Sequence, residues 1–237
     1  MFSRPCLIFA GAVLLFPGSA MAEGGDFFAG FDVSGGWASG SSHTTDGGAD
    51  FAGGGVVGNV DFGHTLGIGG HIGYRFGSSL SASISYQHIR GDVSWDATFP
   101  LFDVTSGFDG NATSHLILGN LAYDWALSDT TAIRASAGLG LALNSLSGVI
   151  ETDVGTGLFL ADVADHTRTS PAGQIGLGLH HRITPDVTLG LNAAVSYTGG
   201  FATGDTRSGN LGITPITPYR ISDVWRTSLG ASMELAF

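Results

Sequence analysis

The sequence predicts an all-β protein, an eight-stranded antiparallel up-and-down transmembrane β-barrel with three short periplasmic turns and four long extracellular loops. Three observations predict it. Eight segments alternate between large apolar and small or polar residues, 39 of the 237 residues are Gly while only 12% are charged, and tight turns alternate with long connections. No stretch after the N-terminus reaches about 18 consecutive apolar residues, so strands must make any membrane crossing.

Charge excludes one class of partner. The net charge is -11, and every one of the nine basic residues is Arg. Nucleic acid is therefore not expected as a partner. No cofactor is expected either, because Gly138-Leu139-Gly140 lies in a strand pattern rather than ahead of a helix, as a dinucleotide fingerprint requires.

The first 22 residues read as a secretory signal peptide. Arg4 precedes an apolar run from Cys6 to Phe16, and Ala20-Met21-Ala22 supplies a small-x-small cleavage site. The run is too short for a bilayer core of about 30 Å. We therefore expect residues 1–22 to be removed and residues 23–237 to form the barrel, which then contains no Cys.

Alternation with a period of two places every second side chain on one face of a strand. The eight segments that keep it are 27–37, 66–76, 80–87, 117–127, 133–144, 174–183, 187–197 and 225–237. One face is large and apolar throughout, whereas the other is Gly, Ser, Ala or polar, and only Leu118 departs from this rule. Small residues suit the narrow interior of an eight-stranded barrel, so the large apolar face is predicted to meet lipid.

The connections are of two kinds. Residues 77–79, 128–130 and 184–186 form tight turns, and residues 39–61, 89–114, 146–171 and 199–222 are expected to form long loops. Short turns at one end and long loops at the other are typical of outer-membrane barrels. The loops hold most of the acidic residues, namely Asp46, Asp50, Asp61, Asp92, Asp96, Asp103, Asp109, Glu151, Asp153, Asp162, Asp165 and Asp205. These acids either solvate the loops or bind divalent cations that bridge to lipopolysaccharide.

Aromatic residues cluster at the strand ends and predict two girdles at the membrane surfaces. Those at the short-turn ends are Phe27, Tyr74, Phe76, Tyr123, Trp125 and Phe237, and those at the long-loop ends are Trp37, Tyr86, Tyr197 and Trp225.

Four loose motifs resemble a known family. They are Gly30-Phe31-Asp32-Val33, Gly73-Tyr74-Arg75-Phe76, Asn120-Leu121-Ala122-Tyr123-Asp124-Trp125 and Ala137-Gly138-Leu139-Gly140. The chain resembles the small outer-membrane β-barrels grouped with the opacity-type surface antigens of Gram-negative bacteria, an OmpA-like barrel type within the porin family. The resemblance implies the cell outer membrane as location, with periplasmic termini and extracellular loops. It also implies that Phe237 is the C-terminal signal for the barrel assembly machinery.

Charged residues on the inward face predict a salt-bridge cluster in the lumen. Asp124 and Arg134 are each five residues from Asp129 in a tight turn, so they face each other on neighbouring strands. Arg75, Arg182 and Glu234 also point inward near the short turns. Buried charges need partners, so these five residues are predicted to close the periplasmic end, although a selectivity filter is the alternative.

The expected function is structural or surface interaction, without catalysis. Ser114-His115 and Asp165-His166 are adjacent pairs whose members point to opposite faces of a strand. An outer-membrane enzyme acting on lipid A or peptides and a narrow channel stay as alternatives. The expected partners are outer-membrane lipid, lipopolysaccharide, the barrel assembly machinery and an extracellular ligand or host protein.

Overall fold

The computed structural model describes residues 26–42, 44–45, 55–77, 79–99, 104–210 and 212–237. Every regular element in these ranges is a β-strand, which confirms the all-β prediction. No helix in them is long and apolar enough to cross a membrane. The signal peptide expected over residues 1–22 lies outside the described ranges.

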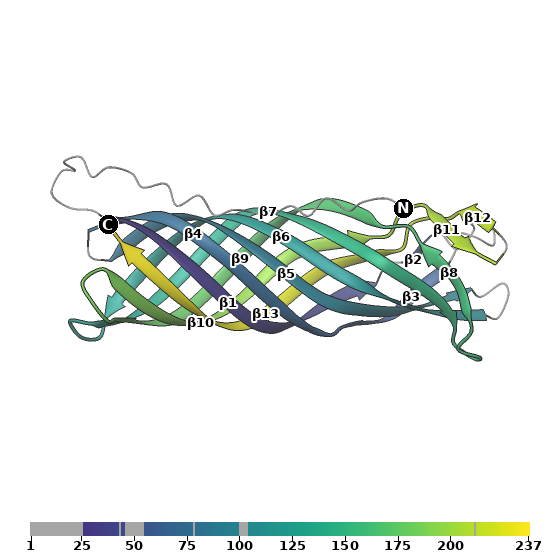
Figure 1. Cartoon of the computed structure of the whole chain (residues 1–237), viewed down its shortest axis with the longest axis horizontal. Helices are drawn as coiled ribbons and strands as arrows, with labels where there is room; N and C mark the ends of the chain where they lie inside the picture. Colours follow the sequence, from purple (N-terminus) through teal and green to yellow (C-terminus); the bar gives the residue numbers. More distant parts are fainter. Residues whose placement is uncertain (1–25, 43, 46–54, 78, 100–103, 211) are drawn as a thin grey trace, which may run out of the picture.

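Eight strands form a closed ring, as predicted (Figure 1). They are β1 (Phe27–Ser42), β4 (His64–Phe76), β5 (Leu80–Phe99), β6 (Val104–Ala126), β7 (Thr131–Asp153), β9 (His166–Arg182), β10 (Val187–Ala202) and β13 (Arg220–Ala236). Each pairs antiparallel with the next in this order, and β13 pairs with β1. Closure satisfies the backbone groups that a free sheet edge would leave without partners.

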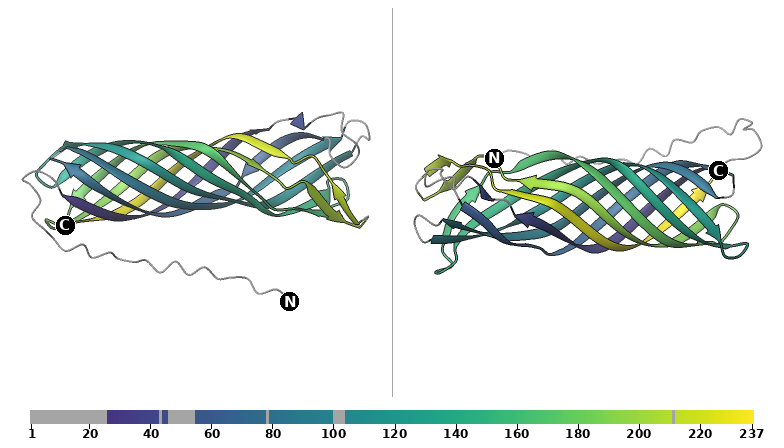
Figure 2. Two further views of the ribbon diagram at one scale, coloured as in Figure 1. Left: turned by 90° about the horizontal axis from the view of Figure 1, so that it is seen from above. Right: turned by 180° about the vertical axis from the view of Figure 1, so that it is seen from behind.

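One end of the barrel carries the three tight turns that the sequence predicted. They join β4 to β5, β6 to β7 and β9 to β10. The start of β1 and the end of β13 lie at this same end, where the Phe237 amide donates to the Phe27 carbonyl at 2.9 Å. We call it the short-turn end, and the opposite one the far end; the C-terminus marks the short-turn end in both views of Figure 2.

The far end differs from the prediction of long loops. Most of residues 89–114 and 146–171, and parts of 39–61 and 199–222, are strand. The five shorter strands there are β2 (Thr44–Thr45), β3 (Gly55–Phe62), β8 (Phe159–Val163), β11 (Thr206–Gly209) and β12 (Gly212–Pro215). β3 pairs with β5 beyond β4, and β8 joins β7 to β11. Figure 1 shows β8, β11 and β12 rising from this rim.

The longest ring strands extend far beyond what a membrane crossing requires. β6 and β7 each contain 23 residues, whereas about 9–11 tilted residues cross a bilayer. At about 3.3 Å per residue, each strand runs for about 75 Å. More than half of each strand thus lies outside any membrane that the barrel crosses.

The prediction of loops was wrong because the alternation of apolar and polar residues continues in these segments. The apolar residues move from the outward positions of the strand to the inward ones. On β5, Ile84 points outward and is 63% exposed, while Ser83 lies in the lumen wall. Further along the same strand Trp95 points inward and is 1% exposed, while Thr98 is exposed. A search for outward apolar residues stops at this inversion, although the strand continues.

The inverted part of the barrel has a core of its own. Its buried residues are Val57, Phe62, Val93, Trp95, Ala97, Phe108, Ala112, Leu146, Val149, Val163, Phe201, Ile216, Tyr219, Ile221 and Val224. The Trp95 and Phe108 rings stack with centroids 5.3 Å apart, and Tyr219 packs 4.7 Å from Phe108. This end is consequently built like a water-soluble β-protein, with apolar side chains inside.

Candidate functional site

The outer wall nearest the short turns is a band of exposed apolar side chains. Leu139 is 79% exposed, Leu66 72%, and Leu191 66%. Phe27 and Trp37, at the two borders of the band, are ten residues apart on one strand. At about 3.3 Å per residue and a strand tilt of about 40°, this separation corresponds to a height of about 25 Å along the barrel axis. That height matches the apolar band of outer-membrane barrels.

The predicted girdle residues border this band. Tyr74 packs edge-on between Phe27 and Phe76, at centroid distances of 5.1 and 5.0 Å, and Tyr123 packs against Trp125 at 4.9 Å. At the other border Tyr197 lies 5.1 Å from Trp225. Trp37 and Tyr86 are 56% and 45% exposed there. Both borders therefore present aromatic rings outward, the position that membrane interfaces favour.

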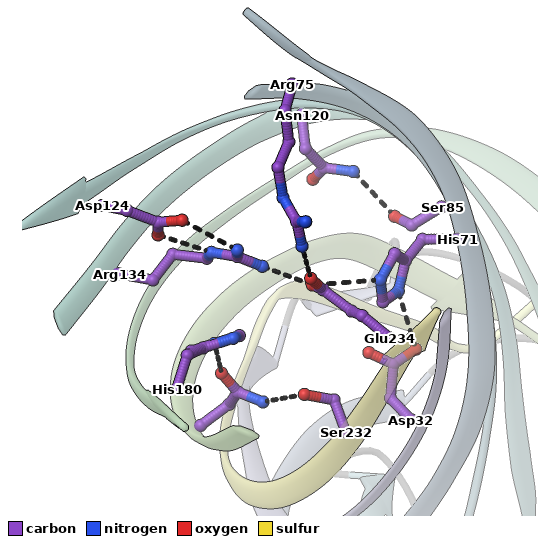
Figure 3. Close-up of polar contacts among 11 residues, drawn as sticks. Asp32, His71, Arg75, Ser85, Asn120, Asp124, Arg134, His180, Ser232 and Glu234 are labelled. Carbon is purple, nitrogen blue, oxygen red and sulfur yellow. Dashed lines mark hydrogen bonds and ion pairs between the residues drawn. The ribbon is translucent and has the colours of Figure 1, made fainter. Parts of the chain in front are cut away.

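Arg134 is the centre of the ion cluster in the lumen (Figure 3). Its Nε and Nη2 donate to the two carboxylate oxygens of Asp124, at 2.7 and 2.9 Å. Its Nη1 donates to Oε1 of Glu234. Asp124 and Arg134 are direct cross-strand partners on β6 and β7, so the short turn between them fixes the bidentate geometry.

Glu234 joins the opposite wall to this pair. Its carboxylate is 3% exposed and accepts a hydrogen bond from Nη2 of Arg75 at 2.7 Å. His71 approaches Glu234 at 3.4 Å and Asp32 at 3.6 Å. Figure 3 shows side chains from both sides of the lumen converging on Glu234. Such cross-wall pairs stabilise the ring because each buried charge would be costly alone.

The structure brings together four of the five residues predicted for the cluster, Asp124, Arg134, Arg75 and Glu234, and places Arg182 apart from them. Arg182 is exposed and makes no ion pair with any described residue, because it ends β9 at the rim, where water solvates it. His71 and Asp32 were missed as members. Both lie on the inward faces that the sequence defined, so alternation alone could have found them.

A polar cavity of about 130 Å³ lies next to the cluster. Gln87, Asn120 and Gln174 line it, and Asn120 donates to Ser85 at 2.9 Å. Two residues further toward the far end on the same strands the lining becomes apolar. This apolar layer consists of Ile89, Leu116, Leu118, Ala142 and Ala172. Leu118, the exception in the alternation, therefore belongs to a second obstruction of the lumen.

A protein-family model and several solved structures match this chain. The model of the outer membrane protein β-barrel domain family matches residues 8–215. The chain belongs to this family. The outer-membrane barrel has no match among curated proteins.

Several solved structures of outer-membrane proteins are similar to this chain. The outer membrane protein OprG from Pseudomonas aeruginosa is 13% identical with a TM-score of 0.52, over 90% of this chain and 96% of that one. Neisserial surface protein A is 16% identical with a TM-score of 0.48, over 91% of this chain and 100% of that one. The outer membrane protease OmpT from Escherichia coli is 7% identical with a TM-score of 0.49, over 90% of this chain and 97% of that one. At these identities the likeness concerns the fold alone.

The residue pairs considered for catalysis do not form a site. Ser114 is buried in the lumen and donates to Asn144 at 2.6 Å, whereas His115 points outward and contacts the Tyr86 hydroxyl at 2.7 Å. Asp165 accepts a hydrogen bond from the Gly148 amide at 2.9 Å. Within the described residues, no group of three or more His, Asp or Glu could hold a metal ion.

The acidic residues of the far end have several roles. Glu151 is 3% exposed and accepts a hydrogen bond from Arg207 at 2.5 Å, so neither residue is merely a solvated loop charge. Burial, together with the charge of Glu151, raises the pKa of the neighbouring Tyr219. Hydrogen bonds from Thr156 lower the pKa of Asp153. Asp46, Asp50 and Asp103 lie outside the described residues.

Proposed function

We propose that this outer-membrane barrel is a non-enzymatic surface protein with a structural or surface-interaction role. The short-turn end and both termini face the periplasm, and the far end projects from the cell as an acidic β-structured extension. It thereby belongs with the porin-family surface antigens. The partners are outer-membrane lipid and lipopolysaccharide, and an extracellular ligand or host protein.

The observation that carries the proposal is the inversion of polarity along continuous strands. Ile84 faces outward in the band, whereas Trp95 is buried inside the far end of the same strand. An extension with its own apolar core suits water, and the band suits lipid. A rigid stem that holds a folded extension away from the membrane is suited to contact with other molecules.

The lumen argues against a channel. The ion cluster around Arg134 and the apolar layer around Leu118 obstruct it at two levels. Eight strands already leave room for little beyond side chains. An enzyme is not favoured, since Ser114 and His115 lie on opposite sides of the wall.

Two further elements of the proposal concern biogenesis. Residues 1–22 direct export, and Phe237 is the signal read by the barrel assembly machinery. Support comes from the position of Phe237, which is 67% exposed and pairs with Phe27 where the ring closes. An accessible aromatic at a strand end is available to a binding partner before closure.

Cysteine labelling on intact cells tests the orientation. The one Cys of the chain, Cys6, lies in the expected leader, so Thr98→Cys at the far end and Asp129→Cys in a short turn provide single labels. A membrane-impermeant maleimide should label Thr98→Cys on intact cells, and Asp129→Cys only after permeabilisation. Labelling of Asp129→Cys on intact cells would show that the orientation is reversed.

Planar-bilayer recordings test the closed lumen. The refolded barrel should give no discrete conductance, and the variant Leu118→Ser with Glu234→Gln should also give none, because the far core around Trp95 still fills the interior. Steady single-channel steps from the unaltered protein would contradict the proposed role and favour the channel.

A further inference from the structure

Arg226 is a buried cation within the lumen that the ion cluster does not use. It lies on the inward face of β13 and is 2% exposed. Its Nε donates to Oγ1 of Thr65 at 2.8 Å, and its Nη2 donates to Oγ of Ser34 at 3.1 Å. Its Nη1 is buried and has no hydrogen-bond partner.

No described carboxylate balances this charge. Arg226 takes part in none of the ion pairs between described residues, whereas the buried Arg134 and Arg207 are each paired with carboxylates. A buried cation without a counter-charge destabilises a fold strongly. Something in the lumen must therefore compensate the guanidinium.

Three proton donors at Arg226 have no acceptor among the described residues. Thr65 and Ser34 accept from the guanidinium through their oxygens, so each hydroxyl still has its own O–H to donate. No hydrogen bond from either hydroxyl to another described residue occurs. The two hydroxyl groups and Nη1 are thus hydrogen-bond donors without acceptors. Such a group of donors suits an anion and not a cation.

The polar cavity of the lumen reaches this group of donors through Ser34. Ser34 and Ser228 line this cavity, whose volume of about 130 Å³ is well above the roughly 10–15 Å³ that a cavity needs to hold one water. Gly67 keeps the wall open here, since a Cβ would lie 2.6 Å from Ser34 Oγ and 3.3 Å from Arg226 Nη2. Ile89 of the apolar layer lies close by, with its Cγ1 3.7 Å from the same Cβ position.

We propose that Arg226, Thr65 and Ser34 bind a small inorganic anion, of the size of chloride, inside the barrel. The anion neutralises the guanidinium and receives the free hydroxyl protons. The main competing arrangement is a water-bridged pair with Asp32, whose Oδ2 is buried without a hydrogen-bond partner two positions from Ser34.

Thermal unfolding of the refolded barrel tests the site at neutral pH and constant ionic strength. Exchange of sodium gluconate for sodium chloride should raise Tm in a saturable way, by about 2–4 °C for a chain of this size. Arg226→Met should abolish the chloride dependence. The control Arg182→Gln, an exposed Arg without an ion pair among the described residues, should retain it.

Two results would overturn the anion site. One is the same response to chloride in the unaltered barrel and in Arg226→Met. The other is non-additive destabilisation by Arg226→Met and Asp32→Asn without any chloride dependence, which would assign the counter-charge to Asp32. Should Arg226→Met fail to refold, bromide-soaked crystals of the unaltered barrel decide, since an anomalous peak beside Arg226 is expected and its absence contradicts the proposal.

Discussion

The band half and the far half of the barrel are made from the same strands, yet their faces are interchanged. On β5, Ile84 lies outside and Ser83 inside in the first half, and in the second half Trp95 lies inside and Thr98 outside. The hydrogen-bond register between β5 and β6 continues without a break through both halves. Between β5 and β6 the inversion therefore needs no change in the backbone, whereas β13 shows register shifts against β1 and β10 near the boundary between the halves.

What differs is the solvent outside each half. Lipid tails are as apolar as a Leu side chain, so the band gains no hydrophobic energy from burying its large residues inside. Water surrounds the far half, where burial of apolar surface stabilises the fold. The interior of the band half is therefore filled by small and paired polar side chains. The interior of the far half is filled by aromatic and aliphatic side chains.

The largest effect should come from the far core. Phe108→Ala removes a ring that stacks on Trp95 and packs against Tyr219. Destabilisation of about 3–5 kcal/mol is expected, confined to the far end. Limited proteolysis and hydrogen exchange should show loosening there while the band stays protected. Simultaneous loss of protection in both halves would mean that they fold as one unit.

The same charge placed on the outer face should destabilise the band half strongly and the far half very little. Leu191→Arg lies in the band and should destabilise the barrel by about 2–4 kcal/mol in lipid. Thr98→Arg lies on the far half and should change stability by less than about 0.5 kcal/mol. Urea-induced unfolding in vesicles measures both. Equal effects would abolish the distinction between the halves.

The ion cluster should contribute less than the far core. Asp124→Asn keeps the shape of the side chain but weakens its bidentate bond with Arg134, which retains Glu234. A loss of about 1.5–3 kcal/mol is expected for a hydrogen bond to a charged group. Heat modification on gels and urea unfolding report it, with Arg182→Gln as the matched control. Unchanged stability would remove the cluster from the forces that hold the ring closed.

The smallest effect should come from the girdle at the boundary between the halves. Trp225→Ala removes a ring that packs on Tyr197 at 5.1 Å, and about 0.5–1.5 kcal/mol is expected from the lost pair. Fluorescence quenching by brominated lipids locates the boundary independently. Absence of Trp225 quenching by shallow bromines would place the girdle elsewhere.

Much of the lumen cluster was predictable because a two-residue period and a short turn suffice to fix cross-strand neighbours. Asp124 and Arg134 follow directly from the turn at Asp129. Glu234 reaches them from β13, a partner known only once the ring closes. Arg182 shows the limit of the argument, since alternation gives the face of a side chain but not whether the strand end leaves it in water.

The sequence by itself determined the strands, the tight turns and the outward face of the band, because these depend on local alternation and turn residues. Only the tertiary structure decided that β5, β6 and β7 continue beyond the band, that Leu118 obstructs the lumen, and that Arg226 has no described carboxylate beside it. The physical reason is that a pattern of alternation defines two faces of a strand, whereas ring closure and the surrounding solvent decide what each face meets.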